Sequence, residues 1–206
     1  IGTRKAFEAA WRYLAFSVAG AGLGLFGLFI LQDYCVTDLF TPGGVLDLSL
    51  AQQNQELLLA VFLIMAIGFG CKAGMFPLHA WLPIAHPVAP APASAVLSGL
   101  ITKMGVLALI RVAYYLYGWE FLDGSWAQKT VLTLSLITIL MGSTLALRED
   151  TLKKRLAYST VSQVSYVIFG LMLFTPGALE GAVFQAIFHA IAKNALFMAT
   201  GAIIYK

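Results

Sequence analysis

Long apolar stretches, separated by short polar segments, form the main pattern along this chain. A membrane core of about 30 Å takes roughly 20 helical residues to cross, and six stretches are close to or above that length. They cover residues 11–31, 56–76, 94–116, 130–147, 156–174 and 181–204. The pattern predicts an all-α integral membrane protein with six transmembrane helices.

Composition supports the same class of protein. The chain is 60% hydrophobic and only 11% charged, whereas a soluble domain has about 25% charged residues. The excess of apolar side chains excludes a soluble enzyme and makes the lipid bilayer the expected surroundings. The net charge of +3 is spread over scattered positions and segment ends, so no basic face for binding nucleic acid is expected.

A run of prolines follows the second apolar stretch. Its members are Pro77, Pro83, Pro87, Pro90 and Pro92. Proline removes a backbone donor and interrupts a continuous helix. We therefore predict a broken helix near residues 72–83, which membrane depth tolerates only where protein or water covers the freed backbone.

Charge is distributed unevenly between the two sides that six crossings define. The basic side has Arg4, Lys5, Arg12, Arg148, Lys153, Lys154, Arg155 and Lys206. The opposite side has Asp33, Asp38, Asp47, Glu56, Glu120, Asp123 and Glu180, with Arg111 and Lys129 as its basic residues. By the positive-inside rule the basic side faces the cytoplasm. We expect a prokaryotic inner membrane as the location.

Glycines in the first stretch match a nucleotide-binding pattern, G-x-G-x-x-G. They are Gly22, Gly24 and Gly27. The pattern has meaning only between a strand and a helix, and here it lies inside an apolar span. Gly20 and Gly24 instead have the G-x-x-x-G spacing that lets helices approach closely. The same packing role is predicted for Gly70 and Gly74.

Cysteine usage gives no sign of a metal or redox site. Cys35 and Cys71 are the only cysteines, and they form no Cys-x-x-Cys pair. We expect no cofactor, no metal and no catalytic residue in this chain. The sequence starts at Ile1 rather than at Met, and we expect it to be either a piece of a longer polypeptide or a processed chain.

Ionisable side chains lie within the apolar stretches. They are Lys72, Lys103, His189 and Lys193. At a rise of 1.5 Å per residue, Lys103 lies about 13 Å from Ser94, and Lys193 lies about 18 Å from Gly181. A lysine at such a depth costs roughly 2.5–3.5 kcal/mol on insertion scales. Because burial also disfavours the charged form of an amine, a row of such groups joined by water predicts a proton relay.

Helical spacing groups some of these residues with other polar side chains. His189 and Lys193 are four residues apart and share one helix face with Gln185. The fifth stretch has a polar patch of Ser159, Thr160, Ser162, Gln163, Ser165 and Tyr166. These side chains either hold ordered water beside the relay or simply bond to neighbouring helices.

Each ionisable residue also has a structural interpretation. Lys72 and Lys103 could each pair with a carboxylate from outside these residues, since no acid lies in the middle of a span. His189 could be a packed core histidine. For His79 and His86, in the proline-rich segment, we favour a structural role.

Four segments together resemble a known family. They read GCKAGMFPLHAWLP from Gly70, HPVAPAPASAVLSGLITKMGVLALIR from His86, LKKRLAYSTVSQVSY from Leu152 and FQAIFHAIAKNALF from Phe184. The chain is similar to the antiporter-like membrane subunits of respiratory complex I, of Mrp-type sodium/proton antiporters and of membrane-bound nickel–iron hydrogenases. The similarity covers most of residues 4–206.

The resemblance implies a fold and a proton pathway. The whole chain 1–206 would be part of one larger inverted-repeat bundle, covering roughly the sixth to eleventh spans. Lys72 matches the lysine before the broken helix, Lys103 a lysine of the next helix, and His189 and Lys193 the linking His-x-x-x-Lys. Gln185 stands where some members have another histidine. The family's paired glutamate and its second broken helix would lie outside residues 1–206.

Two functions are compatible with this resemblance. The first is a proton-translocating subunit of a redox-driven complex, with other membrane subunits and hydrophilic redox subunits as partners. In that case the chain itself would be a non-catalytic part of a translocase. The second is a subunit of a sodium/proton antiporter without redox chemistry, whose partners would all be membrane subunits.

Overall fold

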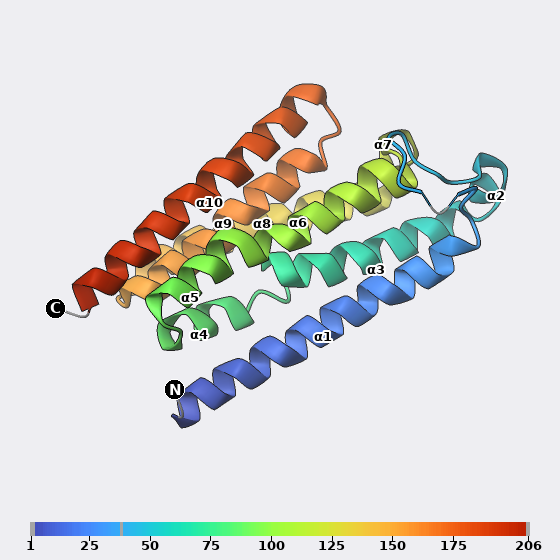
Figure 1. The fold of residues 1–206 in the computed structure, drawn as a ribbon. Helices are drawn as coiled ribbons and strands as arrows, with labels where there is room; N and C mark the ends of the chain where they lie inside the picture. The colour runs from blue at the N-terminus through green and yellow to red at the C-terminus, as the bar shows by residue number, and fades with distance from the viewer. Residues whose placement is uncertain (1–2, 38, 205–206) are drawn as a thin grey trace.

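A computed structural model describes residues 3–37 and 39–204, which form a bundle of helices (Figure 1). The uninterrupted long helices are α1 Arg4–Gln32, α3 Gln55–Ala73, α8 Trp126–Arg148, α9 Leu152–Leu171 and α10 Pro176–Ile204. One further long helix has four consecutive parts, α5 Ala91–Val96, η1 Leu97–Ile101, α6 Thr102–Ile110 and η2 Arg111–Tyr117, where η denotes a π-helix. The short helices are α2 Leu48–Gln53, α4 Trp81–Val88 and α7 Trp119–Leu122. The all-α prediction is confirmed.

Each of the six predicted transmembrane segments corresponds to one long helix. Within the described residues, five of these helices are long and apolar enough to cross a membrane, and α9 is the exception. Helix α9 begins with a basic turn and continues with hydroxyl and amide side chains, and it packs against α8, α10 and α4. It tolerates this polar content because much of it faces neighbouring helices rather than lipid.

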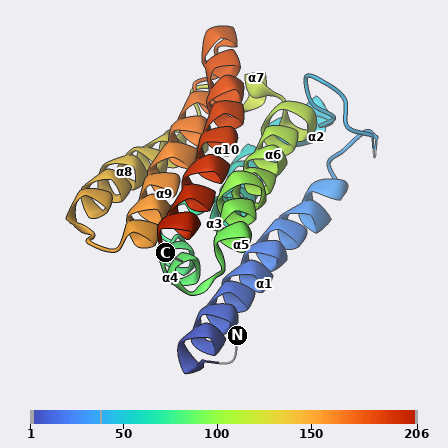
Figure 2. The same cartoon turned by 60° about the vertical axis from the view of Figure 1, so that its left-hand side comes forward.

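The long helices run alternately up and down the bundle. The start of α1, the connection between α8 and α9, and the end of α10 therefore lie at one end (Figures 1 and 2). The basic residues at this end are Arg4, Lys5, Arg12, Arg148, Lys153, Lys154 and Arg155. Helices α2 and α7 lie at the other end, with Asp47 and Glu120. The predicted charge asymmetry is thus confirmed, although Asp38 and Lys206 fall outside the described residues.

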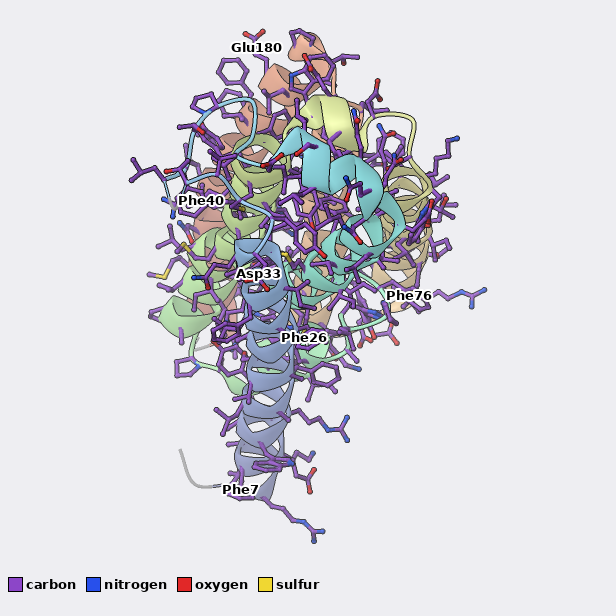
Figure 3. All side chains as sticks on the ribbon, turned by 90° about the vertical axis from the view of Figure 1, so that its right-hand side faces the viewer. Phe7, Phe26, Asp33, Phe40, Phe76 and Glu180 are labelled. Atoms are coloured by element: carbon purple, nitrogen blue, oxygen red, sulfur yellow. The ribbon has the colours of Figure 1, made fainter. Side chains whose placement is uncertain are left out.

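Large apolar side chains remain on the outside of the bundle. On α1, Phe7 is 75% exposed and Phe26 is 55% exposed, and Figure 3 shows both on the stretch of helix that leads up to Asp33. Such a continuous apolar face is unfavourable in water and favourable in lipid. The outer surface therefore agrees with an integral membrane location.

Helix α3 ends at Ala73, three residues earlier than residue 76, where the sequence predicts its end. Gly74 follows with a φ of 88°, in the left-handed region that glycine adopts without strain. The N–H of Met75 then donates to the carbonyl of Gly70 at 2.8 Å, which closes the helix end. The glycine thus ends the helix before the prolines begin.

Protein groups satisfy backbone atoms that the break leaves free. The indole Nε1 of Trp81 donates to the carbonyl of Cys71 at 2.9 Å. The N–H of Phe76 donates to the hydroxyl of Thr138 on α8 at 3.0 Å. The predicted broken helix near residues 72–83 is confirmed, and its freed backbone is covered by neighbouring helices, as membrane depth requires.

Glycines allow α1 and α3 to cross closely. A Cβ atom added to Gly20 would lie 2.7 Å from the carbonyl oxygen of Gly68, and one added to Gly24 would lie 2.8 Å from the ring of Phe69. Gly22, which completes the rejected nucleotide pattern, has open space around its Cα. The packing interpretation of Gly20 and Gly24 is therefore confirmed.

The packing role predicted for Gly70 and Gly74 is wrong. A Cβ atom at Gly70 would meet Met75 in the turn that follows α3, and Gly74 is the left-handed residue that ends that helix. Both glycines serve the local turn rather than a contact between helices. The spacing could not reveal this, because the two roles require the same small residue.

The polar connection between α1 and α3 contains a tight turn at Gly43 and Gly44. Gly43 and Gly44 have φ values of 95° and 100°, and the N–H of Gly44 donates to the carbonyl of Thr41 at 3.2 Å. The N–H of Gly43 donates to the carbonyl of Tyr114, which attaches the turn to η2. Helix α2 then leads into α3.

A bulky side chain at Gly20 is expected to destabilise the protein. The change Gly20→Leu forces apart α1 and α3, at a cost of about 1–3 kcal/mol by the usual effect of overpacking. The matched change Gly22→Leu adds the same side chain to open space on the same helix. Thermal unfolding of the two purified variants tests this, and equal melting temperatures would contradict the predicted crossing.

Candidate functional site

Two of the predicted relay residues are in direct contact, although they are far apart in the sequence. Lys103 lies at the start of α6, and its Nζ is 2.7 Å from Nδ1 of His189 on α10. The same Nζ donates to the carbonyl of Ser98 at 2.6 Å. Both Lys103 and His189 can gain and lose a proton. The contact therefore joins two groups between which a proton can pass.

Lys193 lies one helical turn beyond His189 and is only 4% exposed. Its Nζ donates to the carbonyl of Leu156 at 3.0 Å and to the hydroxyl of Ser159, both on α9. The amine is therefore held against α9, while His189 reaches α6. Lys103 on α6 and His189 and Lys193 on α10 form a cluster that is bonded to α9, and we refer to these three residues as the central cluster.

Lys72 lies at the end of α3, just before the break, and is oriented toward α1. Its Nζ is 2.9 Å from the hydroxyl of Tyr13 and 3.2 Å from that of Ser17. It also lies 4.6 Å from the centre of the Tyr13 ring, an arrangement that stabilises a cation. Helix α6 packs on α3 here, with Gly105 against the backbone of Ala73.

Neutral groups alone account for the hydrogen bonds of these lysines. In the part of the chain that the structure describes, the two ion pairs are Arg4–Glu8 and Lys154–Glu149, both at the basic end of the bundle. A buried cation without a carboxylate is costly. None of the three lysines has a carboxylate partner among the described residues.

The supporting polar residues divide into two groups. Ser159 binds Lys193, and the amide of Gln185 donates to the amide oxygen of Gln163 at 2.6 Å, linking α10 to α9. Ser162 instead faces α8, where its hydroxyl lies 2.8 Å from that of Ser143. The bond made by Ser162 joins two neighbouring helices, as the packing interpretation predicts. A role in the relay stays a prediction for Ser159, Ser162, Gln163 and Gln185.

Several partners of the lysines were not singled out from the sequence. Tyr13 and Ser17 on α1 bind Lys72, and Ser98 binds Lys103 through its carbonyl. A signal did exist for the first pair, because Tyr13 and Ser17 are four residues apart in a largely apolar stretch. No residue pattern indicates that a backbone carbonyl will accept from Lys103.

The remaining histidines are packed against aromatic rings. His86 is fully buried, its ring stacks on Phe197 at 4.6 Å, and neither ring nitrogen has a hydrogen-bond partner among the described residues. His79 stacks on Phe76 at 6.0 Å. These contacts agree with the structural role predicted for both residues.

Metal-binding side chains do not gather within the described residues. No group of three His, Cys, Asp or Glu lies close enough there to hold a metal ion. Cys71 is buried, and its Sγ lies 3.2 Å from the carbonyl of Phe16. That this chain holds no cofactor stays a prediction.

Comparison with known protein families decides which family this fold represents. Residues 2–206 match the profile described as NADH:quinone oxidoreductase/Mrp antiporter, TM. The chain belongs to this family. This membership confirms the resemblance seen in the sequence, and it agrees with the apolar helices and the broken helix described above.

Individual members give the same result for this antiporter-family chain. Hydrogenase-4 component B of Escherichia coli K12 is 42% identical over 158 residues, which cover 71% of this chain and 23% of that protein. A chain in the structure of the Mrp complex from Dietzia sp. DQ12-45-1b superposes with a TM-score of 0.82 at 26% identity, covering 98% of this chain and 36% of that one.

A second solved structure is of a respiratory complex. A chain of the membrane-bound sulfane sulfur reductase, described as an archaeal respiratory membrane complex, superposes with a TM-score of 0.80 at 27% identity. The superposition covers 98% of this chain and 40% of the reductase chain. The chain thus spans well under half of the relatives it matches. It has the fold of an antiporter-like integral membrane subunit.

Proposed function

We propose that this antiporter-family chain belongs to a membrane subunit that translocates protons for a redox-driven complex. The observation that supports this proposal is the 2.7 Å contact between Lys103 and His189, with Lys193 one turn further along the same helix. Three groups that exchange protons, held without a carboxylate among the described residues, are suited to passing protons and poorly suited to holding helices together.

His189 can connect the two lysines through its two ring nitrogens. His189 contacts Lys103 through Nδ1, while its Nε2 is buried and has no hydrogen-bond partner among the described residues. An imidazole can accept a proton at one nitrogen and release the other proton from the second. In the proposed relay Nε2 passes its proton through water toward Lys193.

The proposed partners follow from the named relatives. Hydrogenase-4 component B and the sulfane sulfur reductase chain are subunits of redox assemblies by their names. We propose other membrane subunits as neighbours of this chain, and hydrophilic redox subunits as the source of energy. The chain itself would hold no cofactor. We place the complex in a prokaryotic inner membrane, with the basic end of the bundle in the cytoplasm.

A sodium/proton antiporter without redox chemistry is the second candidate. The observation that favours it is the TM-score of 0.82 with a chain of the Mrp complex. The same central cluster would then exchange protons against sodium ions, and the energy would come from an ion gradient. The two candidates differ in partners and in driving force rather than in the residues of this chain.

Isolation of the native complex tests the proposed function. The complex is purified from membranes, its subunits are identified by mass spectrometry, and its iron and nickel contents are measured. After reconstitution in liposomes, we expect electron transfer to acidify or alkalinise the lumen without a sodium gradient. A complex of membrane subunits alone, in which only a sodium gradient moves protons, would overturn the redox proposal in favour of the antiporter.

A further inference from the structure

The helix that contains Lys103 has an irregular turn directly before it. Residues Leu97–Ile101 form the π-helix η1 between the regular helices α5 and α6. A π-helix has an extra residue in the turn, frequently lies at functional sites, and changes the rotation of everything that follows it. The orientation of Lys103 toward α10 therefore depends on η1 keeping this form.

The carbonyl of Ser98 lies in this π-turn and accepts from side chains. The hydroxyl of Thr102 donates to it at 2.9 Å, and Nζ of Lys103 donates to it at 2.6 Å. Lys103 thus holds the irregular turn that positions it. The turn also comes close to α10, because a Cβ atom added to Gly99 would lie 2.7 Å from Cγ of Asn194.

A buried pair of hydroxyls attaches the π-turn to α9. The Oγ of Ser98 lies 2.5 Å from Oγ1 of Thr160, and both residues are fully buried. The Thr160 hydroxyl donates to the carbonyl of Leu156 at 3.0 Å. Since a hydroxyl has a single hydrogen to donate, Ser98 is the donor and Thr160 the acceptor within the pair.

The same Leu156 carbonyl also accepts from Lys193, at 3.0 Å. Hydrogen bonds therefore connect the two lysines through α9. Lys103 bonds to the Ser98 carbonyl, and the hydroxyl of the same Ser98 bonds to Thr160. Thr160 in turn bonds to the Leu156 carbonyl, which also accepts from Lys193. The two lysines lie on different helices, α6 and α10, and α9 is the helix that both are tied to. A shift of either hydroxyl would change the placement of both amines relative to His189.

We propose that Ser98 and Thr160 are positioning residues that hold Lys103 and Lys193 in place on either side of His189. This inference rests on the proposed proton translocation and adds to it the part that sets the geometry. The two hydroxyls do not themselves need to exchange protons with the cluster. Their role is to keep the π-turn fixed against α9, so that Lys103 stays within reach of the imidazole.

The change Thr160→Val tests this role, because valine has nearly the shape of threonine and lacks the hydroxyl. Proton translocation is measured with the complete complex reconstituted in liposomes. The change removes the Ser98–Thr160 bond between η1 and α9 together with the Thr160–Leu156 bond within α9. We expect the rate to fall roughly fivefold to tenfold. The conservative change Thr160→Ser keeps the hydroxyl and is expected to restore most of the rate.

Thr200→Val is the matched control. Thr200 is also buried, and its hydroxyl donates to the carbonyl of Leu196 at 2.8 Å within α10. Removing that bond is expected to leave proton translocation unchanged. If Thr160→Val does not assemble, Ser98→Ala removes the donor of the same pair with a smaller change. The double variant Ser98→Ala with Thr160→Val is expected to be no slower than the slower single variant, because both single changes remove the same bond between Ser98 and Thr160.

The outcomes separate this inference from the proposed function. Wild-type rates in Thr160→Val and Ser98→Ala, together with loss of translocation in Lys103→Ala, would overturn the positioning role alone. Wild-type rates in Lys103→Ala as well would overturn the proposed function itself. A fall in Thr160→Val that Thr160→Ser does not restore, or an equal fall in Thr200→Val, would show a general packing effect and also overturn the positioning role.

Discussion

Replacing Lys103 by alanine is expected to abolish proton translocation by the complete complex. Lys103 is the group that contacts His189 at 2.7 Å, and no other lysine lies within hydrogen-bonding distance of that imidazole among the described residues. Loss of a positioned proton donor typically slows a proton-transfer step by roughly 100-fold or more. The rate of proton translocation is measured as the pH change that electron transfer drives in liposomes. Electron transfer itself is followed separately and is expected to retain much of its activity.

A second substitution at the same position separates charge from proton exchange. Arginine keeps the positive charge but does not release its proton at physiological pH. Lys103→Arg is therefore expected to be nearly as inactive as Lys103→Ala. Lys129→Ala serves as the control, since Lys129 is an exposed lysine at the start of α8, away from the basic end of the bundle. Full activity of Lys103→Arg would show that only a fixed positive charge is needed there.

Replacing Lys72 by alanine is expected to have the second-largest effect. Lys72 lies next to the broken end of α3 and binds two hydroxyls of α1, Tyr13 and Ser17. Removing the amine removes a proton-exchanging group at the point where α3 is interrupted. We again expect a loss of roughly 100-fold in proton translocation, measured in the same liposomes, with much of the electron transfer preserved.

A milder change at the same contact provides the comparison for Lys72. Tyr13→Phe keeps the aromatic ring near the amine and removes only the hydroxyl at 2.9 Å. It is expected to slow translocation only about fivefold, the usual effect of one hydrogen bond. If Lys72→Ala and Lys103→Ala both pump protons at the wild-type rate, the proposed proton pathway is wrong.

The sequence alone was sufficient to predict the helices of the bundle, the broken helix and the uneven distribution of charge between its two ends. Spans of about 20 apolar residues predict transmembrane helices because an apolar solvent must surround them and each helix satisfies its own backbone. The prolines after Ala73 predict the break, since proline cannot donate to a helix. The basic residues at alternate connections predict which end is which. All of these depend on local chemistry. The structure confirms the helices, the break and the gathering of basic residues at one end of the bundle, with helix ends shifted by up to seven residues, as at the start of α1.

Polar residues inside the spans could also be recognised from the sequence, but their partners could not. Lys103 and His189 are 86 residues apart, and helical spacing defines only the face on which each side chain lies. In a helix that is apolar nearly all round, no stripe of hydrophobic residues indicates which neighbour a given face will meet. Ser162 illustrates this, because it lies in the same patch as Ser159 but faces α8 instead of α10.

The π-turn shows most clearly what only the tertiary structure decided. Residues 97–101 contain no proline, and their Ser98-Gly99 pair does not by itself predict a π-turn, yet the extra residue there rotates Lys103 toward His189. The turn is held by a backbone carbonyl, a hydroxyl on α9 and the lysine itself, three groups that come together only when the helices pack. The sequence therefore determines that ionisable groups lie in the membrane, and the packing of α6, α9 and α10 determines that they form one connected site.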